Sequence, residues 1–259
     1  MDKNTKQPKN LDEIYKSIKS YGYYQMFFLA VMQYSCWIEA GNRAIESLGL
    51  LIPTYKCFDK NLEFELNSTQ IHLNASNACR LIRACQNLTL EKAWTSLHEE
   101  FEWFCESESL KSTLPSLLPF AGLLSFVIAG HVSDYLGRKW IIISGYSIQL
   151  LCGFLEALAP NMGVYMGIHV IKMFARNLSG GAAFVLAIES VHSKYRLIQA
   201  FGFQFSIGYM LAGLTCYLTG HWRRQLLLIN FLGIPLLFIK LLKLEESPRF
   251  LIQKQKYAE

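Results

Sequence analysis

Long apolar runs separated by short polar segments make up most of this 259-residue chain. A helix needs about 20 apolar residues to cross a bilayer, where its backbone groups must hydrogen-bond within their own segment. Six such spans are expected, over 23–52, Ser112–Val132, Trp140–Ala159, Gly163–Ile188, Ile198–Thr219 and Leu226–Leu244. The pattern therefore predicts an all-α membrane protein built as a bundle of six transmembrane helices.

The first span carries polar residues along one helix face. Its continuous apolar part, Tyr23–Ile38, is 16 residues long, which is short for a span. The polar stripe follows directly, at i, i+3, i+4 and i+7: Glu39, Asn42, Arg43 and Glu46. Either the span ends at Ile38 and the stripe is extracellular, or the helix continues to Ile52 and the stripe faces a cavity. We favour the cavity, because a span needs the extra length.

The fourth span has a stripe of its own, with His169, Lys172 and Arg176 at i, i+3 and i+7. A basic side chain that faced lipid at mid-membrane would cost about 2.5–3.5 kcal/mol. These residues are therefore expected to point inward, toward a pore or a partner.

Spans one and four run in opposite directions, so residues on their stripes can be paired by depth below the outer surface. At 1.5 Å of rise per residue, Glu39 and Arg176 both lie ~20 Å below the outer surface. Glu46 and His169 both lie ~9 Å below it. Both pairs are expected to touch across the cavity. Arg43 and Lys172 also lie at one depth, and their positive charges would repel each other unless neighbouring acids or an anionic substrate lie between them. The site then holds both signs of charge, which leaves the sign of the substrate open.

Hydrophobic residues are 52% of the chain and charged residues 17%, against about 25% charged in ordinary soluble domains. The net charge of +5 is uneven, because 54–110 has nine acidic against five basic residues while the amino terminus is rich in lysine. Lysine beside membrane spans indicates a cytoplasmic side, not nucleic-acid binding. The sequence has no nucleotide-binding glycine loop, metal-ligand cluster or nucleophile motif. No enzyme activity, metal or cofactor is expected, and the main surroundings are the lipid bilayer.

The polar stretch 53–111 is expected to be an extracellular loop. It contains three N-x-S/T glycosylation motifs, at Asn67, Asn74 and Asn87. It also contains four of the seven cysteines: Cys57, Cys79, Cys85 and Cys105. An even number of extracellular cysteines predicts two disulfides, and the sequence leaves three connectivities open. A zinc site is the alternative, which the missing CxxC spacing and the glycosylation motifs disfavour.

A short charged segment, GHVSDYLGRK, joins the second and third spans. Gly130 and Asp134 lie four residues apart and share a helix face. Gly137 can take a positive φ and close a tight turn, while Arg138 and Lys139 hold that turn at the cytoplasmic surface. The pattern Gly-x-x-x-Asp-x-x-Gly-Arg-Lys resembles the loop between helices two and three of major facilitator transporters.

Further motifs extend the resemblance over nearly the whole chain. They are LDEIYKSIKSYGYYQ at the amino terminus, EFEWFC before the second span, GHWRRQ before the sixth and ESPRFL after it. Together with Glu189 and Arg196, they make the chain similar to the amino-terminal half of organic cation/carnitine/anion transporters, in the sugar-porter-like branch of the major facilitator superfamily. This resemblance implies half of a twelve-helix fold, in which two six-helix bundles hold the substrate between them.

The resemblance also implies roles for particular residues. A cytoplasmic charge network would lock one state of the transport cycle: Asp134, Arg138, Lys139, Glu189, Arg196, Glu246 and Arg249. The substrate cavity is expected to include Glu39, Asn42, Arg43, Lys172, Arg176, Phe203 and Gln204. The chain departs from the family around Lys172–Ser179, where either Lys172 or Arg176 holds the family's basic position. It also has fewer loop cysteines than many relatives.

The expected organisation is a cytoplasmic amino terminus over 1–22, helices two to six over 112–244, and over 245–259 the start of a cytoplasmic linker to a missing second half. We expect transport of a small organic ion across the plasma membrane by alternating access. Because alternating access needs two bundles, the chain would require its carboxy-terminal half or a pairing transporter. The alternatives are a half-transporter that regulates a full-length one without transporting, and a glycosylated receptor whose loop binds a ligand.

Overall fold

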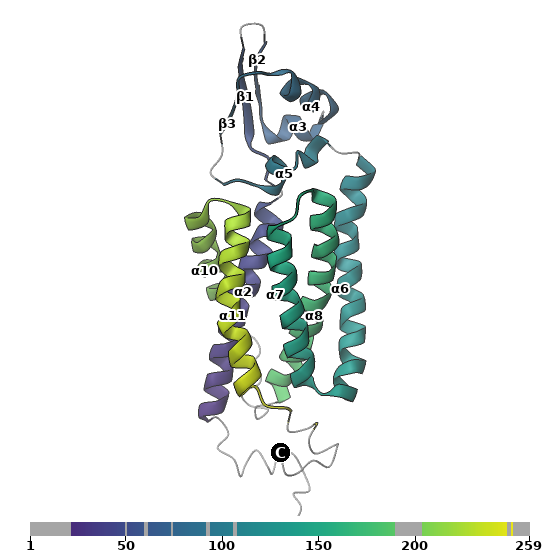
Figure 1. Ribbon diagram of the computed structural model, residues 1–259, viewed down its shortest axis with the longest axis vertical. Coiled ribbons are helices and arrows are strands. Elements are labelled where there is room, and N and C mark those ends of the chain that lie inside the picture. The colour runs from purple at the N-terminus through teal and green to yellow at the C-terminus, as the bar shows by residue number, and fades with distance from the viewer. Residues whose placement is uncertain are drawn as a thin grey trace, which may run out of the picture.

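In the computed structural model the described residues are 22–49, 51–59, 62–73, 75–91, 94–105, 108–189, 204–247 and 250. Six helices of at least 16 residues run side by side through this part of the chain (Figure 1). Their bounds are α2 Tyr23–Leu48, α6 Glu108–Leu136, α7 Arg138–Ala157, α8 Met162–Glu189, α10 Gln204–Thr219 and α11 Trp222–Lys243.

The long helices have the length and composition of membrane spans. Four of them, α6, α7, α8 and α11, are long and apolar enough to cross a bilayer. Helix α10 is apolar with 16 residues, and α2 has 26 residues and carries the charged stripe. The chain is therefore a mostly helical, multi-pass membrane protein. The expected start of the fifth span at Ile198 lies outside the described residues.

Among the helix ends that differ from the expected span ends, those at Leu48 and Trp222 have local reasons. Helix α2 stops at Leu48, and Gly49 follows it as the C-cap. Helix α11 starts early, at Trp222, because the side chain of His221 accepts a 3.1 Å hydrogen bond from the backbone N–H of Arg223. The GHWRRQ motif, expected before the sixth span, therefore lies partly within it, since Arg223 and Arg224 belong to the first turn of α11.

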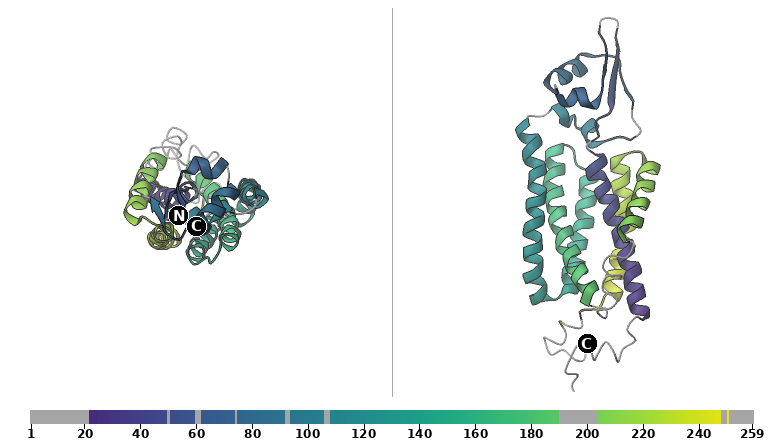
Figure 2. Two further views of the ribbon diagram at one scale, coloured as in Figure 1. Left: turned by 90° about the horizontal axis from the view of Figure 1, so that it is seen from above. Right: turned by 180° about the vertical axis from the view of Figure 1, so that it is seen from behind.

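The helices pack in the order α6, α8, α7, α11, α2 and α10, with each contacting the next. Both views in Figure 2 place α6 and α10 on opposite sides of the bundle. The two helices with charged stripes, α2 and α8, each lie between two neighbours in this order. Their stripes can therefore face the interior of the bundle and stay away from lipid.

The segment 51–105 folds into a small domain at one end of the bundle (Figure 1), which we call the loop domain. Its antiparallel sheet has the order β2-β1-β3, with β1 at Thr54–Asp59, β2 at Leu62–Leu66 and β3 at Leu88–Glu91. Short helices complete it: α3 Ser68–Leu73, α4 Ala75–Ala84, α5 Leu97–Glu100 and the 3₁₀ turn η1 Trp103–Cys105.

Two disulfides close the loop domain, as the cysteine count predicts. Cys57 pairs with Cys85 and ties β1 to the end of α4, while Cys79 pairs with Cys105 and ties α4 to η1. The bonded residues are 28 and 26 positions apart. Bridges over such distances stabilise a small domain by about 2–4 kcal/mol each, mainly by restricting the unfolded chain. Because all four loop cysteines are oxidised, none of them is a thiolate that could bind zinc.

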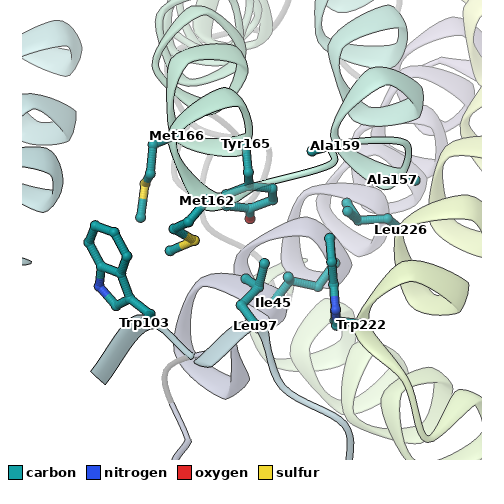
Figure 3. Close-up of a cluster of buried hydrophobic side chains, with 10 residues drawn as sticks. All are labelled: Ile45, Leu97, Trp103, Ala157, Ala159, Met162, Tyr165, Met166, Trp222 and Leu226. Atoms are coloured by element: carbon teal, nitrogen blue, oxygen red, sulfur yellow. The ribbon is translucent and has the colours of Figure 1, made fainter. Parts of the chain in front are cut away.

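A buried apolar cluster fastens the loop domain to the bundle (Figure 3). Leu97 and Trp103 come from the loop domain, and the bundle contributes Ile45, Ala157, Ala159, Met162, Tyr165, Met166, Trp222 and Leu226. These bundle residues belong to α2, the end of α7, the α7–α8 connection, α8 and α11. The loop domain therefore rests on the ends of several helices, and its position is coupled to theirs.

Arg223 reinforces this contact with hydrogen bonds in two directions. Its guanidinium donates to the carbonyl oxygens of Ala157 and Ala159 at 2.6 and 2.8 Å, where α7 ends. It also pairs with Glu100 of the loop domain at 2.7 Å, and the indole N–H of Trp222 donates to the same carboxylate at 2.6 Å. Arg223 thus has a structural role at the contact between the loop domain and the bundle.

Candidate functional site

A cavity of about 320 Å³ lies within the bundle, and all six long helices contribute to its wall. Four charged side chains line it: Glu39, Arg43, Arg176 and Lys240. Four aromatic side chains line it as well: Phe126, Tyr146, Phe184 and Phe205. A cavity with apolar walls and a few charged groups is the usual form of a site for a small organic molecule.

The charged stripes of α2 and α8 meet beside the cavity, as the depth comparison predicts. The Arg176 Nε lies 3.7 Å from Glu39 Oε2, and the His169 Nε2 lies 3.6 Å from Glu46 Oε1. The shortest contact of the four residues, however, joins Arg176 Nη1 to Glu46 Oε1 at 2.6 Å. Glu46 lies seven residues, or about two turns, from Glu39, so the long Arg176 side chain extends along the facing helix, which a comparison of backbone depths does not capture.

Glu156 of α7 is a charged member of this network that the sequence analysis missed. Its carboxylate is fully buried and accepts from Lys172 Nζ at 2.5 Å, and it lies 2.9 Å from His169 Nδ1. The expected repulsion between Lys172 and Arg43 therefore does not arise, because Lys172 faces Glu156. A single glutamate inside the third apolar run was the available signal, since an acid within a span requires a cationic partner.

Other polar groups of α2 also find partners inside the bundle. Gln149 of α7 donates a 2.8 Å hydrogen bond to Glu39 Oε1. The network therefore runs from α2 through α8 to α7. Asn42 is buried and donates to the carbonyl of Ile38 on its own helix at 3.0 Å. Asn42 and Lys172, both expected in the cavity, are thus engaged elsewhere and do not line it.

Lys240 of α11 and Tyr146 of α7 are cavity residues that the sequence analysis also missed. The Lys240 Nζ lies 3.8 Å from the centroid of the Tyr146 ring, a cation–π contact. The signal in the sequence was a lysine, three residues before Lys243, inside the sixth apolar run. Among the predicted cavity residues, Phe203 and the side chain of Gln204 lie outside the described residues, and the adjacent Phe205 lines the cavity.

A second charged cluster lies at the opposite end of the bundle from the loop domain. Arg138 forms an ion pair with Glu189 and lies 3.9 Å from Asp134. The Ser247 hydroxyl donates to Glu189 at 2.6 Å and accepts from Arg138 at 3.2 Å. The cluster joins the α6–α7 turn, the end of α8 and the segment after α11. Arg196 and Arg249, expected in the same network, lie outside the described residues.

Gly137 makes this cluster possible. Its φ of 93° lies in a region that residues with a side chain rarely adopt. Glu246 accepts hydrogen bonds from the backbone N–H groups of Arg138 and Lys139 at 2.9 and 3.2 Å, where the start of a helix attracts anions. A Cβ on Gly137 would collide with that carboxylate. Gly130, by contrast, has open space where a Cβ would stand.

The loop domain presents two of the three glycosylation motifs on its surface. Asn67 and Asn87 are exposed, and Asn74 lies outside the described residues. Asn177, a fourth match to the motif, lies inside α8 and lines the cavity.

Three relatives show what the chain resembles. It is 28% identical over 245 residues to the organic cation transporter protein of Drosophila melanogaster, covering 90% of this chain and 44% of that protein. It is 26% identical over 270 residues to organic cation/carnitine transporter 2 of Arabidopsis thaliana, covering 100% and 49%. It is 30% identical over 168 residues to solute carrier family 22 member 4 of Mus musculus, covering 62% and 29%.

The chain thus spans about half the length of the curated relatives that it matches over most of its own length. Residues 62–259 match the family described as sugar (and other) transporter. Because this match covers well over half of the chain, the protein belongs to the sugar transporter family of the major facilitator superfamily, which is a family of transporters and not of enzymes.

Proposed function

We propose that this chain forms the amino-terminal six-helix half of an organic-ion transporter that works by alternating access with a second half. The observation that carries the proposal is the cavity, where charged and aromatic side chains from all six long helices converge. In transporters of this architecture the substrate binds near mid-membrane, between two bundles. The names of the relatives, an organic cation transporter and an organic cation/carnitine transporter, support the same class of solute.

The charged cluster around Arg138 and Glu189 is proposed as a gate at the cytoplasmic side. Its ion pair and hydrogen bonds join three segments that must separate if the bundle is to change its packing. Breaking it is expected to shift the balance between transport states and not to alter the cavity. Arg138→Gln should therefore lower uptake several-fold at an unchanged ratio between substrates, and a changed ratio at normal turnover would contradict this role.

The proposed orientation places the loop domain outside the cell and both termini in the cytoplasm, in the plasma membrane. The exposed Asn67 and Asn87, the disulfides and the lysine-rich amino terminus support it. Asn67, Asn74 and Asn87 are then glycosylated. Glycosidase treatment of the expressed chain should increase its gel mobility, and replacing the three asparagines by glutamine should abolish that change; a glycan on Asn177 would refute the orientation.

Transport itself can be tested by uptake of labelled organic cations and anions into cells. The cells would express the chain alone, or together with the carboxy-terminal half of the Drosophila organic cation transporter protein. We expect uptake above background only when both halves are present, because one bundle cannot alternate access alone.

The same cells distinguish the alternative of a regulatory half-transporter. If the chain reduces uptake by a co-expressed full-length relative and never supports uptake itself, it is a regulator and the transport proposal is wrong. If the chain has no effect in either setting, neither function holds.

A further inference from the structure

Lys240 is a buried cation that turns into the cavity. It lies within the last turn of α11, and 6% of its surface is exposed. Lys243, at the end of the same turn, is exposed. The Lys240 ammonium could reach the water beyond the helix end, as that of Lys243 does, but instead it lies against the Tyr146 ring at 3.8 Å.

Within the described residues, no oxygen accepts a hydrogen bond from the Lys240 ammonium and no carboxylate lies within ion-pair distance of it. An ammonium group carries three N–H donors, and the face of an aromatic ring satisfies them poorly. The other buried cations of the bundle are paired: Lys172 with Glu156 at 2.5 Å and Arg176 with Glu46 at 2.6 Å. Lys240 is the exception, and it faces the cavity.

The charges in and next to the cavity do not balance. Four basic residues, Arg43, Lys172, Arg176 and Lys240, accompany three carboxylates, Glu39, Glu46 and Glu156. Each of these carboxylates has a cationic partner within 4 Å, but the Oε2 atom of Glu39, 3.7 Å from Arg176 Nε, accepts no hydrogen bond. Arg43 is exposed, lines the cavity, and within the described part of the chain has no carboxylate partner. An entering cation would compete with Arg176 for Glu39, whereas an entering anion would find in Lys240 an ammonium that has no ion-pair partner within the described residues.

We infer that the cavity takes an organic anion, whose carboxylate or sulfonate binds the ammonium of Lys240 while its apolar body lies against the aromatic walls. Phe126, Phe184 and Phe205 supply these walls on α6, α8 and α10. This inference rests on the proposal that the cavity is the substrate site. It differs from what the relatives' names suggest, because those names specify organic cations.

The test compares two probes that share a ring system and differ in charge: 2-naphthoate and 2-naphthyltrimethylammonium. The purified 259-residue chain, reconstituted in lipid nanodiscs, is equilibrated with each probe by dialysis against empty nanodiscs. We expect 2-naphthoate to bind about tenfold more tightly than the cation or better, since one unscreened charge contact in a partly dry site is worth a factor of this order.

Three variants locate the contact. Lys240→Gln should weaken 2-naphthoate binding about tenfold and remove the preference over the cation. Lys240→Arg keeps the charge and should keep the preference. Lys243→Gln removes a lysine from the exposed side of the same turn and should change nothing. The elution volume of each variant on size exclusion reports folding, and Lys240→Gln should fold because it removes an unpaired buried charge.

Different results would overturn different claims. If the cation binds more tightly than 2-naphthoate, the inference is wrong and the organic-ion site stands. If 2-naphthoate binds equally well to Lys240→Gln, the anion does not sit on Lys240 and the inference is wrong. If neither probe binds above the level of empty nanodiscs, the cavity of this chain does not take an organic anion on Lys240 and the inference is wrong, while the two-half uptake assay still tests the proposed function.

Discussion

At the scale of single residues, the notable group is the buried set of Glu156, His169 and Lys172. The Glu156 side chain is fully buried and that of Lys172 is 2% exposed, with 2.5 Å between their charged atoms. Burying two charges carries a desolvation cost that their attraction only offsets when both are present. The pair therefore contributes little net stability as a whole, while the loss of one partner leaves the other charge alone in the bundle.

Glu156→Gln should for this reason destabilise the chain by about 3–5 kcal/mol, because it leaves the Lys172 ammonium without a counter-charge. Adding Lys172→Met should recover most of the loss. The free energy of unfolding in detergent, measured with increasing denaturant, checks both expectations. As a control, Glu102→Gln removes the exposed pair of Glu102 with Arg83 and should cost under about 1 kcal/mol. Equal losses for the buried and the exposed pair would contradict this account.

At the scale of secondary-structure elements, the two motif glycines of the α6–α7 turn have different roles. Gly137 has a positive φ, and its missing side chain leaves room for the Glu246 carboxylate at the start of α7. Gly130 lies inside α6 with nothing within 4 Å of its Cβ position. The motif therefore contains one glycine that this turn needs and one at a position with room for a side chain.

Gly137→Ala should destabilise the chain by about 1–3 kcal/mol through backbone strain, with a further loss as Glu246 is displaced from α7. The matched variant Gly130→Ala should be neutral or stabilising by up to about 1 kcal/mol, since alanine favours a helix over glycine. Thermal unfolding of both variants provides the comparison. A larger loss for Gly130→Ala would show that this turn is not organised around Gly137.

The contact between the loop domain and α11 offers a second prediction at this scale. Arg223→Gln removes the hydrogen bonds to Ala157, Ala159 and Glu100, whereas Arg224→Gln changes an exposed neighbour. Arg223→Gln should increase amide hydrogen exchange in α5 by about tenfold, corresponding to hydrogen bonds worth about 1–3 kcal/mol. Arg224→Gln should leave exchange unchanged, and equal effects of the two variants would argue against the contact.

The same contact should weaken in acid. Partial burial raises the pKa of Glu100, but hydrogen bonds from Arg223 and Trp222 outweigh this, so the pKa lies below the ordinary value of 4.5. A lowered folded-state pKa means that the contribution is fully present above pH 4.5 and is lost as the pH falls through the folded value. The difference in exchange between wild type and Arg223→Gln should therefore shrink toward about pH 3.

At the scale of the whole molecule, α8 connects the two charged clusters. His169 and Arg176 of α8 contact α2, and the last residue of α8 is Glu189 of the proposed gate. A change in how α8 packs on α2 would therefore alter the cavity and the gate together. The interaction free energy between side chains of α2 and α8 is therefore the quantity to measure.

A double-mutant cycle measures this coupling for Arg176 with each of its two acids. The contact with Glu46 is 2.6 Å and that with Glu39 is 3.7 Å, so the first coupling energy should be larger by about 1 kcal/mol or more. The measurement uses Glu46→Gln, Glu39→Gln and Arg176→Gln, alone and combined, with the free energy of unfolding as readout. Additive effects for both pairs would show that the stripes do not interact.

Much of this protein follows from its sequence. Apolar runs near the length of a bilayer must become helices, because only helices satisfy their backbone groups locally in lipid. Helical periodicity then places Glu39 and Glu46 on one face, and Arg176 and His169 on another, and the cost of charge in lipid turns both faces inward. The two disulfides, the tight turn at Gly137 and the family likewise follow from residues and spacings within one or two neighbouring segments.

The tertiary structure decided the partners. Four features depend on how separate segments are rotated and placed against one another. They are the pairing of Cys57 with Cys85, the burial of Glu156 against Lys172, the contact of Arg223 with the end of α7, and the lack of an ion-pair partner for Lys240 within the described residues. The physical reason is that the rules read from sequence act over a short range along the chain. Periodicity and the cost of burial act along a single helix, and they say that a charge must face inward. Which charge it meets there depends on helix order, tilt and side-chain length, and these emerge only when the whole bundle packs.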